Sequence, residues 1–171
     1  MARSLGLGGI TDAFSSRNFR IFWTGNFVHN ITVWVNRMAL GWLTWELTHS
    51  GTWLGLIGAA GMLPMVFVGP LAGVTADRFG HRLQLVTATY IGAITAFVTA
   101  MMVAFDAISP FSLLALTLLS GLTRAFNIPA RSAMVHALVE RRHLSSAIGV
   151  NSATYYGGNF IGPALAGLII S

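Results

Sequence analysis

The chain of 171 residues contains no cysteine and no lysine, and it is poor in charge. The lack of cysteine excludes a disulfide framework and cysteine-ligated metal sites. Charged side chains make up 9% of the chain, whereas soluble domains carry about 25%. Hydrophobic residues make up 54%. There is too little polar surface to cover a globule in water, so the sequence predicts an all-α integral membrane protein.

The positive charge is carried entirely by ten arginines. Together with five acidic residues they give a net charge of +5. A basic face on a soluble fold would suggest nucleic-acid binding. Here most arginines stand at the ends of apolar runs, which is the pattern that orients helices in a membrane. The sequence therefore argues against a nucleic-acid partner and indicates the lipid bilayer.

Five apolar runs are long enough to cross a bilayer, which takes roughly 20 residues. We predict spans at about 21–47, 53–75, 83–105, 111–129 and 144–170. Residues 1–20 form a predicted cytoplasmic N-terminal segment, and residues 21–171 form one helical domain. The last run reaches Ser171 without a hydrophilic tail, and we therefore expect the chain to be a piece of a longer protein.

The connections between the runs differ in arginine content. Arginines precede the first run and occupy the second and fourth connections: Arg3, Arg17, Arg20, Arg78, Arg82, Arg131, Arg141 and Arg142. The first and third connections contain none. Because cytoplasmic loops are enriched in basic residues, the sequence predicts a cytoplasmic N-terminus.

The second connection holds the most distinctive motif, formed by Gly73, Asp77, Arg78, Gly80 and Arg82. Gly73 would let a neighbouring helix approach closely, and Gly80 would give the backbone freedom to turn. Asp77 would meet a helix N-terminus or an arginine. The pattern and its place resemble motif A of the major facilitator superfamily. The resemblance implies a gating turn that latches the two halves of a transporter in the outward-facing state.

The fifth run carries a second pattern of small residues, at Gly149, Gly158, Gly162, Pro163 and Gly167. Spaced glycines form a groove for a partner helix, and proline removes a backbone donor and bends the helix. The pattern is similar to motif C of the drug/proton antiporter branch. That resemblance implies a hinge tied to export, and generic small-residue packing is the alternative.

Further segments, at 37–43, 127–131 and 151–167, resemble the enterobactin-exporter-like subgroup. Members of that family have twelve spans. The resemblance therefore implies an incomplete N-terminal bundle of five spans in the bacterial inner membrane, without the sixth span and the C-terminal domain. The chain departs from the family pattern at Thr117 and Asn159, where arginine is usual.

Polar side chains inside the spans form a candidate substrate path. Asn26, Asn30 and Arg37 lie within about 40° of one another on a helix of about 3.6 residues per turn. The later spans add Arg124, Asn127, Tyr155 and Asn159. A charge inside the membrane costs about 2.5–3.5 kcal/mol on insertion scales, so the arginines should face a watery cavity or a partner. Hydrogen bonding that only holds the helices together is the alternative.

These features predict a secondary transporter that exports a small anionic or amphipathic molecule, such as a siderophore or drug, in exchange for protons. The alternative is a non-transporting half that binds a partner in the membrane. The sequence contains no nucleophile–base pair, zinc motif or carboxylate pair inside the spans. We therefore predict no catalytic residue, no metal and no cofactor.

Overall fold

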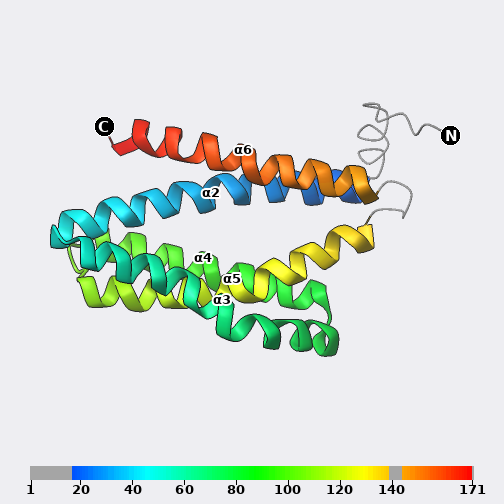
Figure 1. Cartoon of the computed structure of the whole chain (residues 1–171), viewed down its shortest axis with the longest axis horizontal. Helices are drawn as coiled ribbons and strands as arrows, with labels where there is room; N and C mark the ends of the chain where they lie inside the picture. Colours follow the sequence, from blue (N-terminus) through cyan, green and yellow to red (C-terminus); the bar gives the residue numbers. More distant parts are fainter. Residues whose placement is uncertain (1–16, 139–143, 171) are drawn as a thin grey trace. The chain divides into compact units, whose positions relative to one another are not determined.

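The computed structural model describes residues 17–138 and 144–170. They form five helices (Figure 1): α2 (Arg17–Thr48), α3 (Gly51–Phe79), α4 (His81–Ala104), α5 (Pro110–Leu138) and α6 (Leu144–Ile170). The predicted all-helical architecture is confirmed. Most of the predicted N-terminal segment, residues 1–16, lies outside the described residues, and so do three of the arginines that predicted orientation, Arg3, Arg141 and Arg142.

Helices α2, α3 and α5 extend beyond the predicted spans, most clearly α5, whereas the bounds of α6 equal those predicted. The sequence placed the end of this span at residue 129, whereas α5 continues through Pro129 to Leu138. The connections are correspondingly tight, and Gly80 alone separates α3 from α4. Positive φ angles occur at His49, Gly80 and Asp106, each at a helix end where the backbone reverses.

The chain divides into two compact units, residues 1–39 with 135–171 and residues 40–134. In the first unit, the beginning of α2 packs against α6. Phe19, Val135 and Ala147 form a small apolar core there, with Phe22 and Trp23 beside it. This cluster fixes the end of the α2–α6 pair at which α2 begins.

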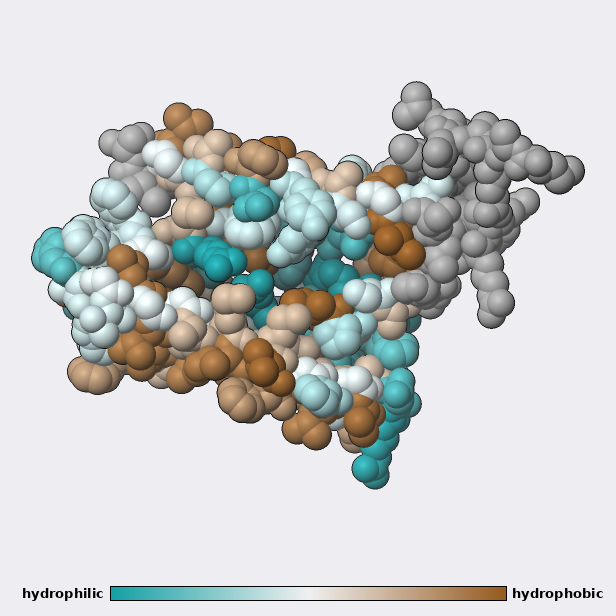
Figure 2. All heavy atoms as spheres, in the orientation of Figure 1, coloured by the Kyte–Doolittle hydropathy of each residue, from teal (hydrophilic) through white to brown (hydrophobic). Residues whose placement is uncertain are grey.

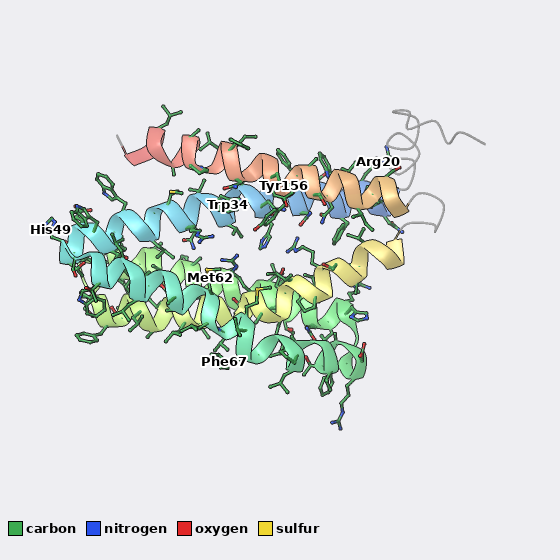
Figure 3. All side chains as sticks on the ribbon, viewed as in Figure 1. Arg20, Trp34, His49, Met62, Phe67 and Tyr156 are labelled. Atoms are coloured by element: carbon green, nitrogen blue, oxygen red, sulfur yellow. The ribbon has the colours of Figure 1, made fainter. Side chains whose placement is uncertain are left out.

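The second unit contains α3, α4 and most of α5. Most of its buried apolar side chains are alanines: Ala60, Ala72, Ala76, Ala88, Ala125 and Ala130. Small side chains let helix backbones approach closely, which is how helices associate in a membrane, where large apolar groups gain nothing by leaving lipid. Large apolar side chains instead point outward. Phe67, for example, is 73% exposed and projects away from α3 in Figure 3.

Three helical segments within the described residues are long and apolar enough to cross a membrane: Gly51–Phe79, His81–Ala104 and Pro110–Val135. Figure 2 shows the brown, hydrophobic side chains that cover α3 in the lower part of the view. Helices α2 and α6 are also long, at 32 and 27 residues. They carry the polar stripes described above, and their assignment as spans stays a prediction.

Helix α3 contains two prolines, Pro64 and Pro70. Each removes a backbone donor from the helical ladder and crowds the preceding turn. Figure 1 shows that α3 changes direction part-way along its length. The proline at 64 also leaves the carbonyl of Ala60 without its usual helical donor, a feature that matters for the packing of α5.

Candidate functional site

The asparagines of the predicted path in α2 bind α6 and each other. Asn26 is 1% exposed, and its Nδ2 donates a short hydrogen bond to Oδ1 of Asn151. Nδ2 of Asn30 donates to the Asn26 carbonyl at 3.0 Å. One turn before Asn26, Nε1 of Trp23 donates to Oγ1 of Thr154 at 2.9 Å. These polar groups hold α2 and α6 together, which is the alternative that the sequence left open for the asparagines.

Trp34 fills the groove that the sequence predicted in α6. A Cβ atom built on Gly162 would overlap Cβ of Trp34 and lie 3.3 Å from its Cα. A Cβ atom on Gly158 would lie 3.2 Å from Cδ1 of the indole. By contrast, a Cβ atom on Gly149 or Gly167 would meet no atom within 4 Å. Within the described residues, two of the four glycines, Gly158 and Gly162, therefore pack against α2.

Beside this contact, α2 and α6 present a cationic and aromatic face. Cζ of Arg37 lies 5.5 Å from the Trp34 ring centroid, over the ring. The Tyr155 ring meets the same indole edge-on, with centroids 5.9 Å apart. Nε1 of Trp34 is buried without a hydrogen-bond partner among the described residues. Arg37, Tyr155 and Asn159 are exposed, so the three groups can meet a ligand.

Figure 3 shows Trp34 on α2 and Tyr156 on α6, within the same unit. Tyr156 extends the aromatic face, since its ring lies 5.6 Å from that of Tyr155 in an edge-on arrangement. A guanidinium over an aromatic ring is partly desolvated and attracted to the ring face. The face therefore offers a positive charge next to flat apolar surfaces, which suits an anionic amphipathic molecule.

The turn between α3 and α4 has the backbone that the sequence predicted. Gly80 has a φ of 89°, and its N–H donates to the Ala76 carbonyl at 2.9 Å. Asp77, Arg78 and Arg82 are exposed. No ion pair joins Asp77 to another residue in the described part of the chain, and no side chain caps the start of α4 there. The turn thus leaves its charged groups available.

Gly73 faces open space, because a Cβ atom built on it meets nothing within 4 Å among the described residues. The close helix approach that we predicted at Gly73 does not occur within this part of the chain. That role stays a prediction, and a helix that uses it would have to come from elsewhere.

A buried glutamine ties three helices together next to this turn. Nε2 of Gln84 in α4 donates to the carbonyls of Ala72 in α3, at 2.9 Å, and of Phe126 in α5, at 3.0 Å. Its Oε1 accepts from Oγ1 of Thr75 at 2.9 Å. Gln84 is 7% exposed and fully bonded. Buried polar groups that are all satisfied specify one packing arrangement.

The polar stripe of α5 also has structural partners. Asn127 is buried, and its Nδ2 donates to Oγ1 of Thr89 at 2.9 Å, while its Oδ1 accepts from Nε of Arg131 at 3.0 Å. Thr117 is buried and donates to the Leu113 carbonyl. The hydroxyl at 117 thus stays within its own helix, where the superfamily pattern has an arginine. Arg124 is half-buried.

Within residues 17–138 and 144–170, no group of three histidine, aspartate or glutamate side chains is placed to hold a metal ion. The acidic residues Glu46, Asp77 and Asp106 stand near helix ends.

The sequence pattern of the transmembrane secretion effector family matches residues 10–171. The chain belongs to this family. It is a branch of the major facilitator superfamily, which agrees with the resemblance found in the two glycine motifs.

Several curated proteins similar to the chain are named for transport, efflux or drug resistance. The staphyloferrin A transporter of Staphylococcus aureus is 24% identical over 153 residues, which cover 89% of this chain and 38% of that protein. Macrolide efflux protein A of Streptococcus pyogenes is 26% identical over 90% of this chain and 38% of its own length. Multidrug resistance protein 1 of Bacillus subtilis is 27% identical over 72% of this chain and 31% of its own length. Among solved structures, none matches the chain.

The chain thus spans less than two fifths of the length of these curated relatives. Sequence reasoning found its glycine motifs, its turn and its polar stripes. It did not find Gln84, which is an amide inside an apolar run, or Trp34 as the partner of Gly158 and Gly162. An uncharged polar residue inside a span is a signal that could have pointed to Gln84, because lipid offers it no hydrogen-bond partner.

Proposed function

We propose that this chain is the N-terminal part of a secondary transporter that exports a small anionic or amphipathic molecule by alternating access. The observation that carries the proposal is that relatives named for staphyloferrin A transport, macrolide efflux and multidrug resistance all match the chain over most of its length. Membership of the transmembrane secretion effector family supports the same direction of transport. The substrate class follows from the arginine and aromatic rings of α2 and α6.

In this proposal, Arg37 binds the anionic group of the substrate, and Trp34 and Tyr155 contact its apolar part. Arg37 already lies over the indole, so little side-chain freedom is lost when a ligand binds. The motif turn Gly73, Asp77, Arg78, Gly80 and Arg82 would act as the gate, and Pro163 with its neighbouring glycines as the hinge.

Arg37→Gln is expected to lower export of an anionic amphipathic dye by about tenfold or more, because a hydrogen bond to a charged group contributes roughly 1.5–3 kcal/mol. The assay uses efflux-deficient bacteria that produce the protein of the complete gene. Arg37→Lys keeps the charge and should restore part of the export. Arg20→Gln, near the beginning of α2 (Figure 3), is the matched control and should export normally.

A cationic dye decides whether charge recognition is the cause. Its export should rise or stay level in Arg37→Gln, since the variant removes like-charge repulsion. An equal loss for both dyes would contradict the assignment of Arg37 to the substrate. No export of any probe by the unaltered protein, produced at normal level in the membrane, would favour the second candidate, a non-transporting half that binds a partner.

We propose a cytoplasmic N-terminus in the bacterial inner membrane, from the arginine pattern. Because the chain has no cysteine, single cysteines report on sidedness without background. Arg82→Cys is expected to resist a membrane-impermeant thiol reagent in intact cells, whereas Ala107→Cys, after α4, should react. Thr52→Cys, at the start of α3, is a second outward control. Labelling of residue 82 in intact cells would reverse the proposed orientation.

Proton coupling is the remaining part of the proposal. The acidic side chains within the described residues lie near helix ends, and a carboxylate from elsewhere in the protein would carry the coupled proton. Export that is unaffected by collapse of the proton gradient, at constant ATP, would exclude proton exchange as the energy source.

A further inference from the structure

A groove of about 350 Å³ opens on the surface of the second unit, between the end of α3, the beginning of α4 and the middle of α5. Its walls are mostly large apolar side chains: Phe79, Leu83, Ile91, Leu119, Leu122 and Phe126. All three helices contain segments apolar enough to cross a membrane. A lipid chain can therefore reach the groove when these helices cross a membrane.

The polar side chains that line the groove have no free donor. Nε2 of Gln84 serves two backbone carbonyls, and its Oε1 accepts from Thr75. The Thr87 hydroxyl donates to the Leu83 carbonyl at 2.9 Å. The Thr123 hydroxyl donates to the Ser120 carbonyl at 2.8 Å. A polar ligand would lose its hydration and gain no hydrogen bond in exchange, so the groove suits an apolar chain.

Two arginines stand at the turn end of the groove. Cζ of Arg78 lies 5.6 Å from the ring centroid of Phe79, which lines the groove. Arg82 directly precedes the lining residue Leu83, and both arginines are exposed. Asp77 is the one acidic residue between positions 51 and 104. The groove end is therefore net positive, and Figure 2 shows teal, hydrophilic side chains where α3 meets α4 at the lower right.

We propose that the groove holds one acyl chain of an anionic phospholipid whose phosphate is bound by Arg78 and Arg82. An apolar chain gains little free energy by leaving lipid for an apolar groove. The groove therefore only positions the acyl chain, and the arginines provide the selectivity for the headgroup. Arginine binds phosphate through paired N–H donors. The lipid comes from the leaflet that adjoins the α3–α4 turn. This site does not depend on the proposed transport activity.

The test is lipid retention by the full chain. The protein is reconstituted with equal amounts of phosphatidylglycerol and phosphatidylcholine, extracted in mild detergent, and its bound lipid is counted by native mass spectrometry. We expect phosphatidylglycerol to be enriched. Each arginine should contribute about fivefold, from about 1 kcal/mol per basic residue near an anionic surface. Arg78→Gln with Arg82→Gln should abolish the preference, whereas Arg17→Gln with Arg20→Gln, an equal change of charge, should keep it.

A second pair of variants tests the groove itself. Thr87→Trp places an indole in the groove and removes only a hydrogen bond within α4, so it should lower retention of both lipids at unchanged helix content. Val86→Trp adds similar bulk beside the groove and should retain lipid normally. If Thr87→Trp does not fold, the two arginine pairs decide the question alone.

Equal retention of the two lipids by the unaltered chain would overturn the proposal. The same holds if the Arg78 and Arg82 pair behaves like the Arg17 and Arg20 pair. If Thr87→Trp folds and keeps all its lipid, the lipid lies elsewhere, and a covering helix of another protein segment becomes the better occupant of the groove.

Discussion

Gly162→Ala is expected to separate α2 from α6 and to destabilise the protein by about 3 kcal/mol, the upper part of the range for overpacking. The added methyl group would overlap Cβ of Trp34 and press on its backbone. No rotamer of Trp34 can move its Cβ atom away, so the helices themselves must shift. Thermal unfolding in detergent, followed by size-exclusion chromatography, should show a midpoint lowered by roughly 10 °C.

The same helix offers graded controls for this experiment. Gly157→Ala meets no atom within 4 Å and should be neutral or slightly stabilising, because alanine is the better helix former. The Cβ atom of Gly158→Ala would lie 3.2 Å from Cδ1 of the indole and 3.5 Å from Cβ of Asn30, a milder overlap than at Gly162, so its cost should fall in between. Equal midpoints for the alanines at 157 and 162 would refute the packing of Trp34 in the α6 groove.

Gly121→Ala is expected to disrupt the packing of the second unit and to lower the free energy of unfolding by about 3 kcal/mol or more. The new Cβ atom would lie 2.9 Å from the Ala60 carbonyl oxygen, 3.0 Å from Cγ of Pro64 and 3.1 Å from the Gly61 carbonyl oxygen. Two of these atoms are backbone and cannot rotate away. Pro64 has no N–H for the Ala60 carbonyl, and the methyl group would press an apolar atom against that oxygen.

The opposite side of this contact provides the control. Gly61→Ala would place its methyl group 3.6 Å from Cγ2 of Thr117, an ordinary contact, and should leave the midpoint within about 2 °C of the unaltered protein. The comparison separates a tight position from a glycine-rich interface in general. If Gly61→Ala and Gly121→Ala lowered the midpoint equally, α3 and α5 would not pack as described.

The helices could be predicted from the apolar runs, because lipid demands that every backbone group be bonded within its own segment. Their ends were harder to place. The prediction for the fourth span stopped at Pro129, yet α5 continues to Leu138. Proline costs a hydrogen bond but does not force a helix to end, and the bilayer thickness that set the predicted length does not limit a helix that leaves the membrane.

The glycines show most clearly what sequence spacing can and cannot predict. Gly149, Gly158, Gly162 and Gly167 belong to one pattern, yet only the middle two receive Trp34. The difference arises from a residue more than 120 positions earlier, which local spacing cannot reveal. Gly121 belongs to neither glycine motif, yet of the described glycines in the second unit it has the closest neighbours.

The polar residues divide in the same way. Asn26 and Asn127 proved to be bonded inside the helix packing, whereas Arg37 stands on an exposed aromatic face. All three looked alike in sequence because each was a polar group in an apolar run. Which of them could meet a ligand depended on the neighbouring helix, and that information lies in the tertiary contacts alone.

The amide of Gln84 has a mechanical consequence. Any sliding between α3 and α5 at this level would break at least one of the bonds of Gln84 to Ala72 and Phe126, and a buried amide that loses its partner is costly. That end of the three helices should therefore move as one rigid body. Bending during a conformational cycle is left to the stretch of α3 around Pro64 and Pro70, where the helical ladder is already interrupted.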